Sequence, residues 1–399
     1  MNPAFYETPP GTPDVVSNSS QAAGLRRAMV AQLEARWVIR NPRIAAATRR
    51  VPRHVFVPDV PLNYAYRDEV VPVKYQESKA VITLSQPSAI ATMLEQLQVE
   101  PGMHVLEVGA GTGYNAALLA ELAEGDRLVA TIDIDVDLIK NARGVLDAAG
   151  YPGVRVITAD GFRGAQELAP FDRIELSVAT RVISPHLVDQ VVDGGLLVGP
   201  LHIKGLPFLT PSFRKQGNQL MSESIRVRSF VPLRGEAATT TPTFRLPVRP
   251  ELRFVWEAND EFPAGLLTRI LRDNSRSRGE IPVSWAAATY LLLTDEDAFY
   301  AETGDQRMRW IALVDRASES LAAIISSADG WGATAVVTYG PDDAYKRMQR
   351  RIEVWVRAVR PGTEALRLTA VPSGEGVKPE QHRARKPFFD VIASYNDSH

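Results

Sequence analysis

The segment VLEVGAGTGYNAALLA, residues 105–120, has the clearest chemical meaning in this sequence. A strand-like run precedes three glycines at alternate positions (Gly109, Gly111 and Gly113), and a helical pattern follows them. Glycine adopts backbone angles that other residues avoid and lets the chain pass close to a ligand. With Ala110 and Thr112 completing the turn, this segment predicts a small-molecule site at a strand-to-helix junction.

Acidic residues near this turn indicate which ligand it holds. Glu107 disfavours a pyrophosphate group and suits the cationic end of S-adenosylmethionine. Asp133 ends the next predicted strand, where a carboxylate accepts hydrogen bonds from both ribose hydroxyls, with Asp135 as the alternative. Asp160 and Gly161 follow the third predicted strand, and we expect Asp160 to contact the adenine amine. Together these positions favour S-adenosylmethionine over the two alternatives, a nicotinamide-binding Rossmann domain and a glycine turn without a ligand.

Strands and helices that alternate along the chain must position these residues. The pattern predicts an α/β fold with a doubly wound, Rossmann-like parallel sheet and right-handed crossovers. The expected strands are residues 104–108, 127–132, 154–158, 171–178 and 196–198, and the expected helices are 85–98, 114–122, 136–149 and 184–192. Ser85 is the expected N-cap of the first of these helices, with Pro87 in its first turn.

Changes in composition divide the chain into four parts. Residues 1–20 read as a flexible N-terminal arm, 21–235 as the ligand-binding domain, 236–250 as a Pro/Thr-rich linker and 251–399 as an α+β accessory domain, expected to recognise the substrate. Helical patterns cover residues 21–50, 266–271 and 284–293, and strand-like patterns cover 331–338 and 351–356.

Composition narrows the possible partners and sites. The absence of cysteine excludes a disulfide framework, a Cys-based zinc site and a Cys nucleophile. No His/Asp/Glu group has metal-ligand spacing, so no metal is predicted. A formal net charge of −2 provides no basic field for nucleic acid, and no run of 18 apolar residues suits a membrane. We therefore expect a cytoplasmic protein without nucleic-acid or membrane partners; the oligomeric state stays open.

Five further segments carry a family resemblance. VPRHVFVP (51–58), AYRDE (65–69), LSQPSAIATMLEQL (84–97), ITADGFRG (157–164) and FVPLRG (230–235) surround the glycine-rich segment. Their order resembles that of protein-L-isoaspartate O-methyltransferases over about residues 20–235. The resemblance implies a class I methyltransferase fold and a peptide or protein substrate carrying Asp or isoAsp. Enzymes of that family esterify the free carboxylate of an isoaspartyl residue, and the ester then collapses to a succinimide.

The resemblance also assigns a substrate loop. The family's Gly-Gln-Thr-Ile-Ser-Gln-Pro stretch matches residues 81–87, where Val81 and Ile82 replace the Gly-Gln pair. A carboxylate is already ionised at neutral pH, so it needs no general base but must be held in place. Hydroxyls at a helix start can do this, so Thr83 and Ser85 are the predicted catalytic residues. The predicted substrate-binding residues are Val81, Ile82, Leu84, Gln86 and Arg163.

The chain continues far beyond this match. Its layout resembles that of the C-terminally extended aspartyl methyltransferases of graspetide pathways, which modify ribosomally made peptides. We therefore predict an O-methyltransferase that esterifies an aspartyl carboxylate in such a peptide, leading to an aspartimide. The alternative is an isoaspartyl methyltransferase that acts in protein repair. A non-catalytic adaptor is disfavoured because the cofactor motif is complete.

Overall fold

The structure is a computed structural model that describes most of the chain. The described residues are 15–76, 79–204, 206–228, 230–239, 243–246, 248, 251–255, 263–272, 274–280, 285–305, 308–327, 335–357, 365–373, 382–384 and 389–395. Most of the predicted arm, part of the predicted linker and the start of the strand predicted at 331–338 lie outside these residues.

A parallel sheet forms the first part of the molecule, as predicted. Its strands are β3 (Val105–Val108), β4 (Val129–Asp133), β5 (Arg155–Thr158), β6 (Phe171–Leu176) and β7 (Val191–Val198). They lie in the order β7-β6-β3-β4-β5 and pair in parallel throughout. The chain leaves β3 toward β4 and β5 and later returns to its other side as β6 and β7. In an open α/β sheet, ligands bind where the strand order reverses in this way, which here lies between β3 and β6.

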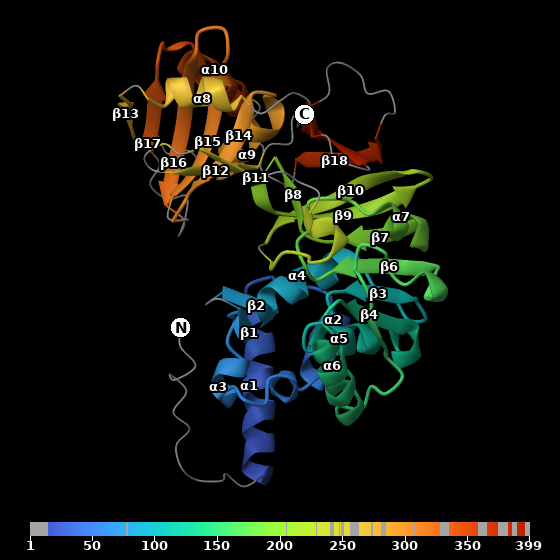
Figure 1. Cartoon of the computed structure of the whole chain (residues 1–399). Coiled ribbons are helices and arrows are strands. Elements are labelled where there is room, and N and C mark those ends of the chain that lie inside the picture. Colours follow the sequence, from blue (N-terminus) through green and yellow to red (C-terminus); the bar gives the residue numbers. More distant parts are fainter. Residues whose placement is uncertain are drawn as a thin grey trace.

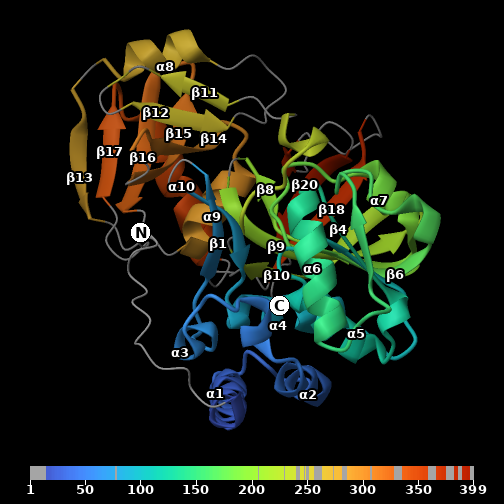
Figure 2. The same cartoon turned by 60° about the horizontal axis from the view of Figure 1, so that its bottom comes forward.

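Helices cover this sheet and supply its apolar layers. They are α1 (Val15–Ala35), α2 (Pro42–Arg50), α3 (Leu62–Ala65), α4 (Pro87–Leu97), α5 (Tyr114–Ala123), α6 (Val136–Ala148) and α7 (Pro185–Gln190). Short 3-10 turns are η2 (Arg53–Phe56), η3 (Asp126–Leu128), η4 (Gln166–Leu168) and η5 (Glu236–Thr239). One buried cluster joins α1, α2, α4 and α5 to one face of the sheet. Figure 2 shows α1 and α2 together below α4.

The predicted cap of α4 is wrong. The helix begins at Pro87 after Gln86, and Ser85 does not cap it. Instead, Asp68 accepts a hydrogen bond from the Ser88 backbone N–H at 2.8 Å and pairs with Arg36 at 2.7 Å. A carboxylate from a distant segment thus satisfies the helix start. This leaves the Ser85 hydroxyl available for another role.

Antiparallel strands extend the same sheet beyond β7. These are β8 (Leu201–Ile203), β9 (Leu206–Gln216), β10 (Gln219–Val227), β18 (Leu366–Pro372), β19 (His382–Ala384) and β20 (Phe389–Tyr395). The pairing runs β7-β9-β10-β18-β20-β19, with β8 beside β9. The end of the chain therefore returns to the first sheet, and Figure 1 shows β18 alongside β10. This pairing differs from the predicted grouping of 251–399 as one accessory domain.

A second, antiparallel sheet lies between β10 and β18 in the sequence. Its order is β11-β12-β14-β15-β16-β17-β13. The strands are β11 (Thr243–Leu246), β12 (Leu252–Val255), β13 (Arg276–Glu280), β14 (Ala298–Thr303), β15 (Met308–Asp315), β16 (Ser320–Ser327) and β17 (Ala335–Tyr339). The helices of this part are α8 (Ala264–Ile270), α9 (Trp285–Thr294) and α10 (Asp343–Arg357). Strand β11 falls inside the predicted linker, so that segment is not only a connection.

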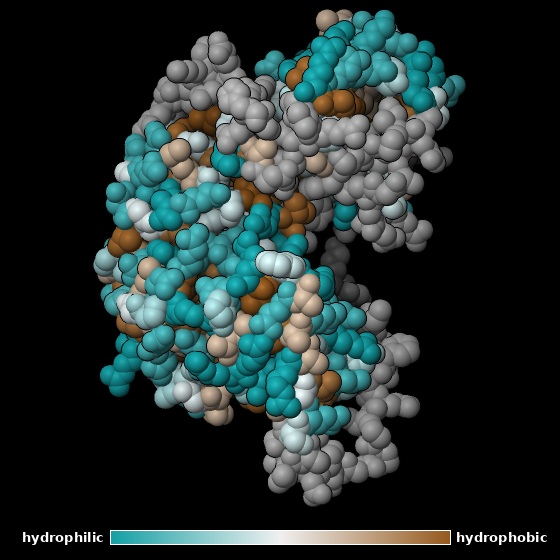
Figure 3. All heavy atoms as spheres, turned by 180° about the vertical axis from the view of Figure 1, so that it is seen from behind, coloured by the Kyte–Doolittle hydropathy of each residue, from teal (hydrophilic) through white to brown (hydrophobic). Residues whose placement is uncertain are grey.

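The two sheets share one apolar core. A continuous buried cluster runs from Leu106 in β3 through Leu366 in β18 to Leu291 in α9 and Ile311 in β15. A separate cluster packs α8 on the other face of the second sheet. Seen from behind, most of the described surface is hydrophilic, with hydrophobic residues in small groups (Figure 3). The second sheet is therefore packed onto the first through α9, α10 and the last strands.

The strand predicted at 351–356 is also wrong, because these residues belong to helix α10. Ala344, Met348 and Trp355 are buried on one side of this helix. Ile352 packs against the same core. The spacing of these four positions has a helical period. The helices predicted at 266–271 and 284–293 are confirmed as α8 and α9.

Candidate active site

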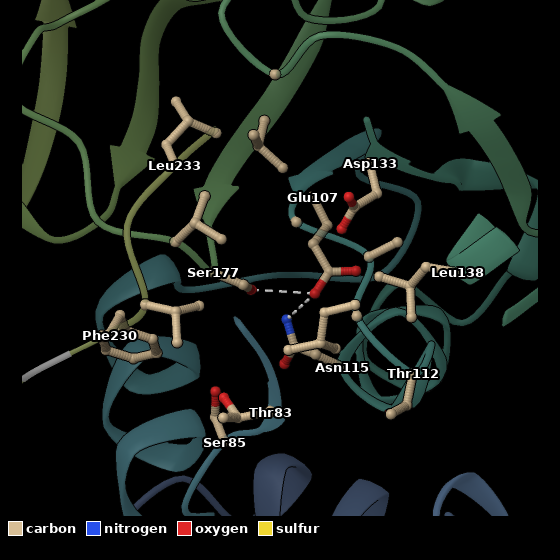
Figure 4. Close-up of a pocket in the computed structure, with 18 of the residues that line it drawn as sticks. Thr83, Ser85, Glu107, Thr112, Asn115, Asp133, Leu138, Ser177, Phe230 and Leu233 are labelled. Atoms are coloured by element: carbon tan, nitrogen blue, oxygen red, sulfur yellow. Dashed lines mark hydrogen bonds between the residues drawn. The ribbon is translucent and has the colours of Figure 1, made fainter. Parts of the chain in front are cut away.

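A cavity opens at the carboxyl ends of β3, β4 and β6, where the strand order reverses (Figure 4). It encloses about 890 Å³, including the space at its open mouth. Its walls come from residues 82–85, the glycine-rich turn, the ends of the three strands and the segment 230–234. β2 (Lys79–Leu84) pairs with β1 (Val71–Gln76) as a hairpin beside this opening.

The glycine-rich turn forms one wall, as predicted. Gly109 and Gly113 have φ angles of 102° and 87°, which glycine tolerates best. A Cβ on Gly109 would lie 2.9 Å from Val178 Cγ1, so a larger residue would press this turn against the strand end. Ala110, Gly111 and Thr112 also line the cavity. The turn therefore brings backbone close to a ligand at the start of α5.

Glu107 lies at the base of the cavity and is 1% exposed. Its carboxylate accepts hydrogen bonds from Asn115 at 2.8 Å, Thr131 at 2.7 Å and Ser177 at 3.1 Å. Burial raises the pKa of Glu107 to about 7, and these hydrogen bonds lower it in part. Glu107 lines the cavity, and its contact with a ligand stays a prediction.

A second buried acid, Glu175, was not predicted from the sequence. It sits directly beside Glu107 in the parallel register of β3 and β6, and it also lines the cavity. Asn115 donates to its carboxylate at 2.9 Å, and burial raises the pKa of Glu175 to about 8. The signal that could have revealed it is a charged residue inside the otherwise apolar end of the strand FDRIEL.

Asp133 lines the cavity on the opposite side of β3, at the end of β4. Its carboxylate lies 3.3 Å from the Arg234 guanidinium. Asp135 instead caps α6 by accepting from the Leu138 N–H, and it pairs with Lys74 at 2.9 Å. Because Asp133 lines the cavity and Asp135 does not, Asp133 remains the predicted ribose ligand.

Asp160, the residue predicted to contact adenine, lies next to the cavity lining but is not part of it. Gly161 lines the cavity, but Asp160 does not. The Asp160 carboxylate accepts hydrogen bonds from the backbone N–H groups of Phe162 and Glu236, at 2.9 and 2.8 Å. It therefore ties the turn after β5 to the segment after β10. Its contact with adenine stays a prediction.

The predicted catalytic pair lies across the cavity from Glu107. Thr83 and Ser85 line the wall side by side, with Asn115 between them and the acid (Figure 4). Both are partly buried. The buried guanidinium of Arg53 donates to the Ser85 carbonyl oxygen at 2.8 Å and thereby fixes the loop. Arg53 belongs to the VPRHVFVP segment, which gives that segment a positioning role.

The predicted substrate-binding residues divide into two groups. Ile82 and Leu84 line the cavity, and the side chain of Val81 lies outside the described part of the structure. Gln86 and Arg163 do not line it. Gln86 donates to the Asp68 carbonyl at 2.8 Å, and the exposed Arg163 pairs with Glu236 at 2.8 Å.

The segment 230–234 covers the cavity, a role that the sequence did not reveal. The backbone of Ala179 bonds to Val231 and Leu233 at 2.8 and 2.7 Å, which fixes the segment beside the end of β6. Phe230 and Leu233 line the side opposite Leu138 (Figure 4). These side chains give the cavity an apolar wall.

The described residues contain no group of three or more His, Asp or Glu side chains that could hold a metal ion. No described helix is both long and apolar enough to cross a membrane.

Comparison with known proteins identifies the family. The family described as Protein-L-isoaspartate(D-aspartate) O-methyltransferase matches residues 25–238. The chain belongs to this family. It is 38% identical over 219 residues to the protein-L-isoaspartate O-methyltransferase of Hyperthermus butylicus, covering 53% of this chain and 89% of that one. The corresponding enzyme of Picosynechococcus sp. is 36% identical over 228 residues, covering 57% and 97%.

The fold agrees with this assignment. A solved protein-L-isoaspartate O-methyltransferase is similar over 92% of this chain and 98% of that one, with a TM-score of 0.52 and 20% sequence identity. The predicted Rossmann-like class I methyltransferase fold is confirmed. The protein is an S-adenosylmethionine-dependent protein carboxyl O-methyltransferase. The lining of the cavity is compatible with that cofactor, because it combines the buried acids Glu107 and Glu175 with Asp133 and the apolar side chain of Leu138.

Proposed function

We propose that this methyltransferase esterifies the free carboxylate of isoaspartyl residues in proteins and peptides. The observation that carries the proposal is the position of Thr83 and Ser85 on the cavity wall across from Glu107 (Figure 4). Both residues belong to the stretch that resembles the family's substrate loop. The names of the curated relatives state the same activity for those proteins.

The chemistry requires positioning more than acid–base catalysis. A substrate carboxylate is ionised at neutral pH and attacks a methyl carbon without a general base. When bound, S-adenosylmethionine supplies that methyl group on a sulfonium. The Thr83 and Ser85 hydroxyls can donate to the carboxylate, while Phe230 and Ile82 exclude water from one side. Orientation of this kind contributes roughly 7–11 kcal/mol in favourable systems.

The test is methyl transfer by the full chain to matched peptides. One peptide carries isoaspartate, and the control carries aspartate at the same position. We expect rapid labelling of the isoaspartyl peptide from labelled S-adenosylmethionine, followed by loss of methanol as the succinimide forms. Equal labelling of both peptides, or labelling of neither while the cofactor still binds, would reject isoaspartyl specificity.

A second candidate is methylation of one aspartate in a modified ribosomal peptide. Two observations favour it: Val81 and Ile82 replace the Gly-Gln pair of the family's loop, and a second sheet packs onto the methyltransferase sheet. Remote binding energy from such a region can orient a less accessible aspartate. The predicted recognition role of residues 251–399 stays part of this second proposal.

This candidate needs its own substrate. A cyclised, ester- or amide-bridged peptide with one free aspartate would be compared with its linear form and with the isoaspartyl peptide. Preference for the cyclised peptide over both others would favour the second candidate. The full chain must be used, because removing residues 251–399 would take away β18 and expose the shared core.

A further inference from the structure

At the base of the cofactor cavity, the side-chain amide of Asn115 donates hydrogen bonds to two carboxyl groups, those of Glu107 and Glu175. Glu107 and Glu175 are register partners on neighbouring strands, and each is 1% exposed. Asn115 Nδ2 donates to both, at 2.8 and 2.9 Å. Each of the three residues lines the cavity. Like charges on directly opposed strand positions repel one another, so this pair is costly without a compensating cation.

No such cation is found in the described part of the chain. The donors to Glu107 are Asn115, Thr131 and Ser177, all neutral, and the donor to Glu175 is Asn115. No described Lys, Arg or His forms an ion pair with either acid. The other charged group that acts on Glu107 is Asp133, which is also negative. The base of the cavity thus holds two buried carboxyl groups, opens to ligand and has no compensating cation among the described residues.

Two further polar atoms of this cavity, Asn115 Oδ1 and Thr112 Oγ1, are buried and have no hydrogen-bond partner among the described residues. In Figure 4, the Asn115 oxygen points away from Glu107 and toward the side of Thr83 and Ser85. A buried acceptor without a partner is unfavourable, and a ligand with several N–H donors would satisfy it.

The sheet order shows which end of the cofactor meets this base. Asp133, the predicted ribose ligand, lies on β4 at one side of β3. Glu175 lies on β6 at the other side. A ligand with its ribose at Asp133 therefore extends its amino-acid part toward β6. An ammonium group carries the charge and the donors that the base lacks.

We propose that Glu175, joined to Glu107 through Asn115, receives the ammonium group of the cofactor and selects ligands that carry it. Glu175 is then a specificity residue for the cofactor in addition to Glu107. In the empty cavity the Glu175 carboxyl group is protonated, and it releases this proton to solvent when the ammonium binds. The inference depends on the cofactor and not on which peptide is methylated, so it goes beyond the proposed function.

Calorimetric titration of Glu175→Gln with four ligands tests the proposal. S-adenosylmethionine, S-adenosylhomocysteine and decarboxylated S-adenosylmethionine all carry the ammonium, whereas methylthioadenosine lacks the amino-acid part. We expect the variant to bind the first three at least about tenfold more weakly and methylthioadenosine as the wild type does. Equal weakening for all four ligands, or unchanged affinity for the first three, would overturn the proposal. The matched control is Glu319→Gln, an exposed acid between β15 and β16 of the second sheet.

A measurement on the wild type does not depend on the variant. At pH 6.5 the ligand's ammonium is protonated, so titration in buffers of different ionisation enthalpy counts protons from the protein. We expect net proton release when S-adenosylhomocysteine binds and less release with Glu175→Gln. Net release that is the same in both proteins contradicts the role of Glu175.

The stability of the empty protein gives a third readout. Burial raises the pKa of Glu175 to about 8 from its ordinary value of 4.5. The stability that protonated Glu175 gives the folded protein is fully present below pH 4.5, the ordinary pKa, and is lost as the pH rises through 8. Glu175→Gln should therefore melt above the wild type at about pH 9 and close to it at about pH 5. A variant that melts lower at both pH values would show a structural role instead.

Discussion

Two buried acid sites in this molecule have opposite environments. In the part of the chain that forms the second sheet (the second region, residues 243–357), Asp295 has a fully buried side chain. It is paired with Arg347 at 2.6 Å and Arg351 at 3.2 Å. At the base of the cofactor cavity, Glu107 and Glu175 are as deeply buried but have neutral donors only among the described residues. Two arginines balance the charge of Asp295, whereas no described cation balances the charge of Glu107 and Glu175.

This difference separates a structural site from a binding site. Asp295 follows α9, and its carbonyl oxygen accepts from Lys204 Nζ at 2.6 Å, which joins the second region to the turn after β8. Its carboxylate pairs with two arginines of α10 and so holds α10 against the end of α9. The cavity pair keeps its charge available for a ligand. Buried acids whose pKa is raised without a protein cation are candidates for functional sites.

The largest effect is expected for Asp295→Ala. This substitution removes the buried acid that pairs with Arg351 and leaves Arg347 paired with Asp297 alone, so it should lower the free energy of unfolding by about 3 kcal/mol. Chemical denaturation of the unliganded protein measures it, with Glu319→Ala, which removes an exposed pair, as the control. Cofactor affinity of the folded fraction should stay unchanged. A tenfold loss of affinity would break the comparison by linking Asp295 to the cavity.

Asp133→Ala tests the ribose end of the cavity. Loss of a charge-assisted hydrogen bond should weaken S-adenosylmethionine binding by about 1.5–3 kcal/mol, measured by calorimetric titration. Asp135→Ala is the matched control because Asp135 caps α6 and should affect stability more than affinity. If Asp135→Ala has the larger effect on affinity, the ribose assignment is wrong.

Ser85→Ala should lower methyl transfer about tenfold, because a hydroxyl that holds the substrate carboxylate is lost. Affinity for the cofactor should remain within about twofold of the wild type, since Ser85 lies across the cavity from Asp133. Single-turnover rates and calorimetry measure the two quantities separately. Full turnover, or an equal loss of cofactor affinity, would leave Ser85 with a structural role.

The smallest effect is expected for Arg163→Ala. The side chain is 66% exposed, pairs with Glu236 and does not line the cavity. Exposed ion pairs contribute little, so turnover and KM should change by less than about twofold. A large rise in KM for a peptide substrate would restore Arg163 to the substrate-binding residues and extend the site beyond the cavity.

The sequence by itself determined the cofactor turn and the alternating elements around it. The turn at Gly109–Gly113 is local, because glycine spacing and the flanking strand and helix patterns fix its backbone over a few residues. The same holds for α5, α8 and α9, whose periodicity lies within one segment. In α10, residues 351–356 taken alone alternate like a strand, and the helical period appears only over the full length of the helix.

Only the tertiary structure decided which distant residues meet. Glu175 stands beside Glu107 because β6 returns to the side of β3 opposite β4, a choice of strand order that no local pattern encodes. Asp68 replaces Ser85 as the partner of the α4 start for a similar reason, since a packed segment brings it there. The return of β18 to β10 joins residues about 150 positions apart. Such contacts depend on burying one shared apolar core, which is a property of the whole chain and not of any segment.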